Sequence, residues 1–185
     1  MQAPTQPLPS AQEVIDFWRA AGPERWFRKD EAFDAEFRSR FLAAHEAAAH
    51  GALDGWGDSA EGSLALLVLL DQFPRNAFRG TARMYATDAK AREIARTAVA
   101  RGHNAAVESE LQGFFCLPFM HSEDPADQER SVELSRTLGE DTRKFALHHR
   151  DVVRRFGRFP HRNAVLGRET TAEEQRFLDE GGFGG

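Results

Sequence analysis

The sequence has little of several features that mark common classes of protein. Cys116 is the one cysteine, so no disulfide can form within the chain. The longest aliphatic run, residues 64–70, is far shorter than the roughly 20 apolar residues that a membrane-spanning helix needs. Residues 1–9 have neither a basic region nor an apolar stretch, so we expect no signal peptide. These absences predict a cytoplasmic protein with no membrane partner.

Familiar catalytic motifs and a basic charge balance are also missing. We find no Gly-x-x-x-x-Gly-Lys phosphate loop, no Gly-x-Ser-x-Gly elbow and no His-Glu-x-x-His pair. The formal net charge of −5 argues against a nucleic-acid partner. The residues available for a metal site are His121, Glu123, His149 and His161. The arginines near them in sequence would repel a cation, so we expect no metal and no other cofactor.

What the chain does contain is enough apolar sequence for one folded domain. Of its 185 residues, 41% are hydrophobic, and phenylalanine contributes 15 residues against one tyrosine. This composition excludes disorder over most of the length. Three prolines in residues 1–9 predict a flexible tail, and the Gly-Gly-Phe-Gly-Gly sequence of residues 181–185 predicts a frayed one. Residues 10–180 are then expected to form a single helical domain.

Helical periodicity dominates this domain. An apolar stripe with helical spacing is formed by Phe33, Phe37, Phe41, Ala44 and Ala48. Residues 61–72 are apolar nearly all round, which predicts a central helix. No segment alternates as a strand does, so we predict an all-α fold of antiparallel helical hairpins in a single compact domain. The hairpin intervals approach the tetratricopeptide period of about 34 residues, so we predict a tetratricopeptide-like stack, although the consensus residues of that repeat are not visible.

Three polar strings stand beside apolar segments. The first is Asp-Gln-Phe-Pro-Arg-Asn at residues 71–76. The second is Leu-Pro-Phe-Met-His-Ser-Glu-Asp at residues 117–124. The third is Arg-Phe-Gly-Arg-Phe-Pro-His-Arg-Asn at residues 155–163. Polar side chains at the ends of apolar helices can be presented from a rigid scaffold, so these strings are the candidates for a functional site.

The three strings resemble the hallmark sequences of a bacterial family that is catalogued as a domain of unknown function. The resemblance extends over nearly the whole chain. It includes Val-Ile-Asp-Phe-Trp at residues 14–18, Trp-Phe-Arg-Lys-Asp at 26–30 and Thr-x-Glu-Glu-x-x-Phe-Leu at 171–178. The family is grouped with tetratricopeptide-like helical folds, so the resemblance implies such a fold here. The family has no established activity, and the resemblance therefore implies a set of positions without a reaction.

Asp71 follows the apolar segment directly and is expected to be buried. An ionised carboxylate loses several kcal/mol of solvation when it is buried, unless it is paired. The candidate partners are Arg75, Arg158 and Arg162. A buried ion pair of this kind is as consistent with a structural role as with a ligand contact.

His149 is expected on the inward face of its helix. The residues that share one arc at about 100° per residue are Phe145, His149, Val152 and Phe156. A core histidine bonded to a carbonyl or a carboxylate is the structural alternative to a functional one. The surrounding segment is strongly basic, with a single acid, Asp151, against Arg143, Lys144, Arg150, Arg154, Arg155, Arg158, Arg162 and Arg168.

The first and third strings also resemble each other. Phe-Pro-Arg-Asn-Ala in residues 73–81 and Phe-Pro-His-Arg-Asn-Ala in residues 159–170 each follow a helix and precede a glycine. In the structural interpretation, the asparagine bonds nearby backbone and the arginine bridges helix ends. In the functional interpretation, the two arginine-bearing loops close on one ligand.

Two functions remain open at this point. One is a site for a small anionic ligand that bears a phosphate or carboxylate, with acid–base chemistry if the protein is an enzyme. The other is a helical module that binds a protein or peptide, in which the polar strings are structural. Residue types favour the first. Its candidate acid–base residues are His149 and His121, and its candidate ligand-binding residues are Asp71, Arg75, Asn76, Glu123, Arg155, Arg158, His161, Arg162 and Asn163.

Overall fold

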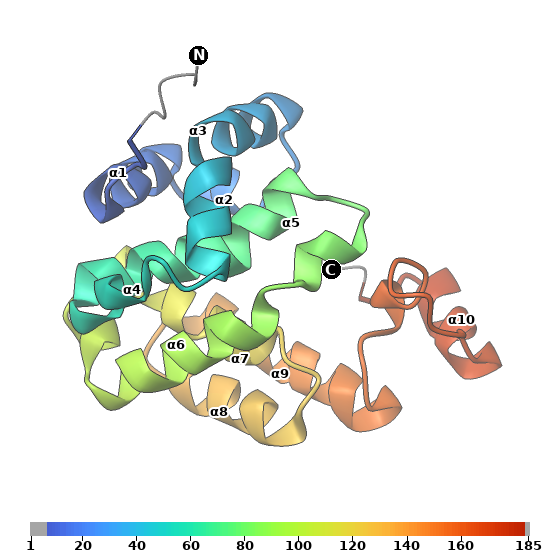
Figure 1. The fold of residues 1–185 in the computed structure, drawn as a ribbon. Coiled ribbons are helices and arrows are strands. Elements are labelled where there is room, and N and C mark those ends of the chain that lie inside the picture. The colour runs from blue at the N-terminus through green and yellow to red at the C-terminus, as the bar shows by residue number, and fades with distance from the viewer. Residues whose placement is uncertain (1–6, 184–185) are drawn as a thin grey trace, which may run out of the picture.

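Every regular element in residues 7–183, the part of the chain that this computed structural model describes, is helical (Figure 1). The α-helices are α1 (Ala11–Ala21), α2 (Pro23–Trp26), α3 (Glu31–Ala49), α4 (Ala60–Leu67), α5 (Phe73–Ala77), α6 (Asp88–Ala100), α7 (Leu117–Met120), α8 (Pro125–Ser135), α9 (Glu140–Phe156) and α10 (Ala172–Asp179). Shorter 3₁₀-helices cover Asp54–Asp58, Ala82–Tyr85, His103–Ala105, Ser109–Phe115 and Pro160–Arg162, and a π-helix covers Val68–Gln72. The predicted all-α fold is confirmed. The packing is compatible with hairpin stacking, although the short segments interrupt it.

Capping side chains explain where several helices begin. Ser10 and Glu13 form a capping box at the start of α1, and Asp30 accepts the backbone N–H groups of the first turn of α3. Asp124 caps α8 ahead of its first residue, a proline. Thr171 forms a second capping box at the start of α10. These caps satisfy donors that the first turn of a helix leaves without partners.

The core is built mainly from the aromatic faces of α1 and α3, with α4 and the segment that follows it. Trp18, Phe37 and Phe73 are each at most 1% exposed, and the rings of Phe37 and Phe73 meet edge to face at 5.0 Å. Cys116 belongs to a smaller cluster and is 1% exposed. Burial raises the pKa of its thiol to about 12, so the thiol is unreactive at neutral pH.

The central helix predicted over residues 61–72 changes its winding partway. It is α-helical to Leu67 and π-helical from Val68. The proline at position 74 explains this change of winding. Pro74 has no N–H to give to the carbonyls of the preceding turn. Two side chains replace that donor: His45 Nδ1 bonds Leu69 O at 2.8 Å, and the Thr87 hydroxyl donates to Leu70 O at 2.6 Å. The π-helical segment carries Asp71, and π-helical segments are frequently found at functional sites.

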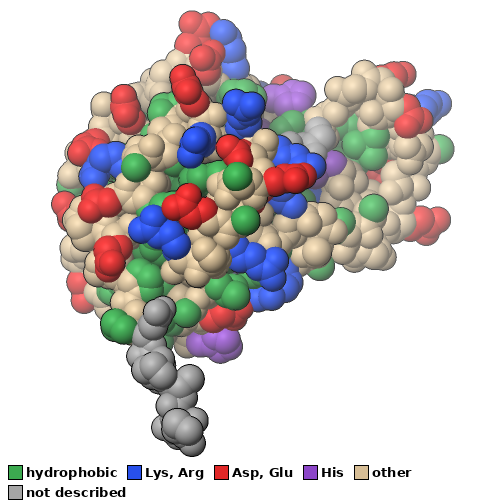
Figure 2. Space-filling view, turned by 90° about the horizontal axis from the view of Figure 1, so that it is seen from above, with side chains coloured by type: hydrophobic (Ala, Val, Ile, Leu, Met, Phe, Trp, Pro, Cys, Tyr) green, Lys and Arg blue, Asp and Glu red, His purple; other side chains and the backbone are tan. Residues whose placement is uncertain are grey.

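Helix α9 places its buried apolar side chains in two smaller clusters, apart from this main core. Helix α9 lies against α8, and α10 with its preceding turn forms a lobe set off from the body (Figures 1 and 2). His149 is buried, as predicted, but Phe145 is 59% exposed and its predicted inward position is wrong. Because α9 packs on α7 and α8, its covered face is centred on Ala146 and Val153 instead. Within the described range, each helix is too short or too polar to cross a bilayer.

Candidate functional site

A buried ion cluster lies where the π-helical segment, α5 and the end of α7 meet. Asp71 is 1% exposed, and its Oδ1 accepts a 2.7 Å hydrogen bond from Nδ1 of His121. Arg75 Nη1 lies 3.3 Å from the same oxygen, and Gln72 Nε2 donates to the other oxygen at 2.6 Å. The predicted burial of Asp71 and its pairing with an arginine are confirmed. Arg75 is the partner among the three arginines considered.

The charges of this pair follow from burial and hydrogen bonding. Burial alone would raise the pKa of the Asp71 carboxyl, but His121, Arg75 and Gln72 outweigh it and hold the pKa well below its usual range. Burial and the charge of Arg75 lower the pKa of His121, despite the neighbouring carboxylate. At neutral pH a neutral His121 therefore donates its Nδ1 proton to ionised Asp71. The lone pair then lies on Nε2, which is the arrangement of an oriented general base.

Arg75 is held on its other side by Asp88, the first residue of α6. Its two terminal nitrogens donate to the two oxygens of Asp88 at 2.8 and 3.0 Å, and Asp88 is 7% exposed. Burial lowers the pKa of the Arg75 guanidinium, but Asp71 and Asp88 outweigh burial and raise it. Arg75 is therefore a fully paired cation that joins the π-helical segment to α6.

Two further histidines complete an imidazole group with His121. The ring centroid of His149, on α9, lies 6.4 Å from that of His121, and its Nδ1 donates to the carbonyl of Phe145 at 2.7 Å. Burial lowers the pKa of His149 to about 3 and that of His161 to about 4. His149 thus has the carbonyl partner of a core histidine, whereas the buried Nδ1 of His161 has no hydrogen-bond partner among residues 7–183.

Arg162 enters the same cluster from the 3₁₀ turn after α9. It is 7% exposed, and its guanidinium carbon lies 4.5 Å from each of two ring centroids, those of Tyr85 and Phe159. Nη2 donates to the carbonyl of His121 at 2.9 Å, and Nη1 lies 3.9 Å from a carboxylate oxygen of Asp88. Its Nε is buried and bonds to nothing in the described part of the chain. A buried guanidinium with an unused donor is unusual, because such groups are normally satisfied.

Asn76 lies outside this cluster and has a structural role. Its Nδ2 donates to Oδ1 of Asp34 on α3 at 2.7 Å. Arg79 Nε donates to the other oxygen of the same carboxylate at 2.6 Å. The two side chains attach α5 and the turn after it to α3.

Asn163 and Arg158 repeat that arrangement in the C-terminal lobe. Asn163 Nδ2 donates to Oε2 of Glu174 at 3.2 Å, and Arg158 Nε donates to Oε1 at 2.6 Å. The bond from Arg158 is the main reason that the pKa of Glu174, which is 2% exposed, is lowered. The structure therefore brings Arg158 and Asn163 to α10 and not to the histidines.

Glu123 bonds to the turn after α9 and to Arg168. Its Oε1 accepts the backbone N–H of Phe159 at 2.8 Å, and both of its oxygens pair with Arg168, at 2.7 and 2.9 Å. Glu123 thereby holds the turn that presents His161. No group of three or more His, Cys, Asp or Glu side chains in the described residues is arranged to hold a metal ion.

The basic segment of the sequence is mostly neutralised by acids. Arg155, for example, pairs with Glu173 at 3.0 Å on the surface. Other pairs at or below 3.0 Å involve Lys144, Arg150, Arg154, Arg158 and Arg168. Arg162, with its carboxylate at 3.9 Å, differs from all of these.

Three residues of the cluster were missed in the sequence. Tyr85 lies beneath both guanidinium groups, at 4.5 Å from Arg162 and 5.6 Å from Arg75. It is the single tyrosine of a chain rich in phenylalanine, which is the signal that would have identified it. Asp88 stands at a helix start, where capping is the ordinary role. Phe183 belongs to the tail that was expected to fray, and its ring instead lies 4.3 Å from that of His149.

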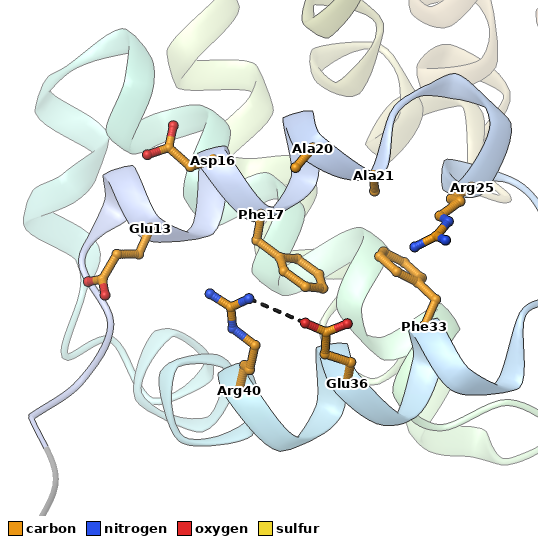
Figure 3. A pocket seen from close by; sticks show the side chains of 9 residues that line it. All are labelled: Glu13, Asp16, Phe17, Ala20, Ala21, Arg25, Phe33, Glu36 and Arg40. Atoms are coloured by element: carbon orange, nitrogen blue, oxygen red, sulfur yellow. Dashed lines mark hydrogen bonds and ion pairs between the residues drawn. The ribbon is translucent and has the colours of Figure 1, made fainter.

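Two surface hollows lie away from the cluster. One, of about 380 Å³, separates α1 from α3 (Figure 3). The rings of Phe17 and Phe33 stack on each other at its floor, with centroids 5.3 Å apart, and the Glu36–Arg40 ion pair, at 3.4 Å, lies at its side. The other, of about 270 Å³, lies beside α6 and includes Ser63. Neither is lined by a histidine or by an arginine of the cluster.

A family model for a bacterial protein of unknown function, DUF924, matches residues 14–182. The chain belongs to this family. A solved structure, of the protein of unknown function ATU0120 from Agrobacterium tumefaciens, is similar with a TM-score of 0.90 and 57% sequence identity over 92% of this chain and 97% of that chain. A search of curated proteins finds no match. The predicted family is confirmed.

Proposed function

We propose that the cluster around Arg162 binds a small anion that carries a phosphate or carboxylate group. The observation that carries this proposal is the buried Nε of Arg162, which has no partner in residues 7–183. Burial and the charge of Arg75 lower the pKa of Arg162, so the site holds its cation at a cost. An anion on that donor removes the cost, because guanidinium groups bind phosphate and carboxylate oxygens strongly.

Binding of the anion is also expected to be coupled to protonation of His161. His161 has a buried Nδ1 that bonds to no group in the part of the chain that the structure describes, and burial lowers its pKa to about 4. An anion placed between Arg162 and His161 supplies the missing partner and raises that pKa. Binding is therefore expected to take up a proton and to strengthen as the pH falls toward 6.

His121 is the residue best suited to acid–base chemistry on such a ligand. Its Nδ1 is fixed by Asp71, so its Nε2 has a defined direction and a free lone pair at neutral pH. Its carbonyl accepts a hydrogen bond from Arg162, which couples the proposed base to the proposed anion site. This role depends on the anion site and is secondary to it.

A helical module for a peptide is the second candidate, and the hollow between α1 and α3 favours it. Phe17 and Phe33 form an apolar floor, and Glu13, Asp16 and Arg25 lie on the rim (Figure 3). Apolar floors with polar rims are common in protein interfaces. The buried cluster is preferred because it contains an unused donor, whereas Arg40 beside this hollow already pairs with Glu36.

A thermal-shift titration tests the anion site. Sodium phosphate at about 100 times its Kd stabilises a protein by about 2.7 kcal/mol, which raises the Tm of a chain of this size by roughly 5–10 °C. Sodium chloride of equal ionic strength serves as the salt control. We expect Arg162→Gln to abolish the phosphate-dependent shift.

The matched control is Arg155→Gln, because Arg155 is an exposed arginine of the same segment. This variant is expected to keep the full shift. If both variants respond as the unmodified protein does, phosphate binds elsewhere and the proposal is wrong. If the unmodified protein shows no shift with phosphate or acetate, the peptide-binding candidate takes precedence.

A further inference from the structure

The ring of Phe183 fills a box of four aromatic side chains at the edge of the cluster. Its centroid lies 4.3 Å from that of His149, 5.1 Å from His161, 5.5 Å from His148 and 6.0 Å from Phe159. The interplanar angles are between 52° and 82°, so the contacts are tilted or edge to face. These are the orientations that aromatic rings prefer. The box is therefore shaped to accept a flat ring.

The backbone of the tail explains how this ring reaches the box. Gly181 has a φ of +79°, and the N–H of Gly182 donates to the carbonyl of Phe177 at 2.8 Å. A side-chain Cβ at Gly182 would lie 2.3 Å from that carbonyl oxygen, so the turn requires glycine there. This C-terminal glycine turn reverses the chain after α10 and directs Phe183 back toward α9.

The aromatic box and the proposed anion site share a wall. Phe159 contacts the ring of Phe183 on one side, and its own ring lies 4.5 Å from the guanidinium carbon of Arg162 on another. His161 likewise contacts Phe183 and carries the Nδ1 that has no partner in the described residues. In Figure 2 basic, acidic and histidine side chains lie together at the junction between the body and the lobe. A ligand that used both features would have a ring next to a negative group.

We propose that the ligand is an aromatic anion, whose ring takes the box that Phe183 occupies while its charged group binds Arg162. This inference rests on the proposed anion site and adds the chemical class of the ligand. Phe183 is then an intramolecular competitor for the ring and not for the charge. It is half-buried and follows two glycines, so the aromatic contacts of the box are what hold it in place.

Calorimetric titration with phenyl phosphate and with inorganic phosphate tests the inference. The free energy of one aromatic pair is enough to change an affinity severalfold. Because Phe183→Ala removes the ring that competes for the box, it should bind phenyl phosphate about fivefold more tightly than the unmodified protein. Its affinity for inorganic phosphate should stay within about twofold of the unmodified value, since that probe has no ring. A chain that ends at Gly182 should behave as Phe183→Ala does, which separates the loss of the ring from any effect of the new alanine.

The matched control is Phe27→Ala, which removes an aromatic ring that is 71% exposed and packs on Phe114 away from the cluster. It should leave both affinities unchanged. An equal gain for both probes in Phe183→Ala, or no gain for phenyl phosphate, overturns the aromatic ligand while Arg162-dependent phosphate binding stands. If the unmodified protein does not bind inorganic phosphate, the anion site itself is wrong, and this inference is wrong with it.

Discussion

Two short helical turns of similar sequence, in α5 and in the 3₁₀-helix after α9, meet at one point of the molecule. They differ in whether the donors of their arginines have partners. Residues 73–76 and 159–163 each run from Phe-Pro to Arg-Asn. Arg75 and Arg162 both reach Asp88, the first through two hydrogen bonds of 2.8 and 3.0 Å and the second at 3.9 Å. The first turn is closed by carboxylates. The second leaves a buried guanidinium donor without a partner among residues 7–183.

The contacts of the two turns show which residues of the repeated pattern are structural. Both asparagines share a carboxylate with a second arginine, so the asparagine in each turn fastens it to a neighbouring helix. The arginines diverge in their electrostatics. Burial lowers the pKa of both, but Asp71 and Asp88 reverse the direction for Arg75 alone. We infer that Arg75 serves the fold and that Arg162 serves a ligand.

Removing Asp71, the carboxylate of the preceding π-helical segment that pairs with Arg75 of the first turn, should have the largest effect. Asp71→Ala is expected to lower the free energy of unfolding by about 3–5 kcal/mol, because Arg75 loses a buried partner. Urea unfolding monitored by circular dichroism measures this loss. Asp151→Ala, which removes an exposed acid, should stay within about 0.5 kcal/mol of the unmodified protein. A loss below about 1 kcal/mol for Asp71→Ala would contradict the buried network.

Exchanging the two arginines for glutamine tests the comparison itself. Arg75→Gln should cost about 3 kcal/mol of unfolding free energy, since it leaves Asp71 and Asp88 buried without a close cation. Arg162→Gln should cost less, about 1 kcal/mol, because the hydrogen bond to a carbonyl, the long ion pair and the contacts with Tyr85 and Phe159 that it removes are offset by relief from burying a cation. The same unfolding experiment compares them. Equal losses would mean that the two turns do the same structural work.

Acid should destabilise the cluster through its histidines. The pKa of His149 is about 3 in the folded protein, below the unfolded value of about 6.5, so the unfolded state binds more protons between these values. Stability is therefore full above pH 6.5 and falls as the pH falls toward 3. Between pH 7 and pH 5, His149 alone should account for a loss of about 2 kcal/mol.

Unfolding at the two pH values in His149→Gln measures this contribution. The variant should lose about 2 kcal/mol less than the unmodified protein on going from pH 7 to pH 5. His50→Gln changes an exposed histidine and serves as the control. An identical pH dependence in His149→Gln and the unmodified protein would show that His149 does not titrate as a buried neutral imidazole.

Much of the fold follows from local patterns in the sequence. Caps such as Ser10 with Glu13 stand next to the helices that they start, and the Phe33–Phe37–Phe41 stripe has a helical period. The burial of Asp71 follows from the apolar segment that ends there. The exposed position of Phe145 could not be predicted, because periodicity defines a face and not the helices that cover it.

The candidate site was predicted only in part, for a related reason. Asp71, Arg75, His121, His149, His161 and Arg162 converge. Arg158 and Asn163 were grouped with them by proximity in sequence, yet Glu174 draws both toward α10. Tyr85 and Phe183 come from segments without a polar motif. Their contribution depends on tertiary contacts that no local pattern encodes.

The claim that Arg162 holds a spare donor for a ligand is tested most directly by a crystal structure determined with phosphate at saturating concentration. We expect a phosphate oxygen within hydrogen-bond distance of Nε of Arg162, with His161 as a second partner and with Arg75 still bound to Asp71 and Asp88. A structure in which Nε of Arg162 bonds only to protein or water, with no anion beside it, would contradict the account.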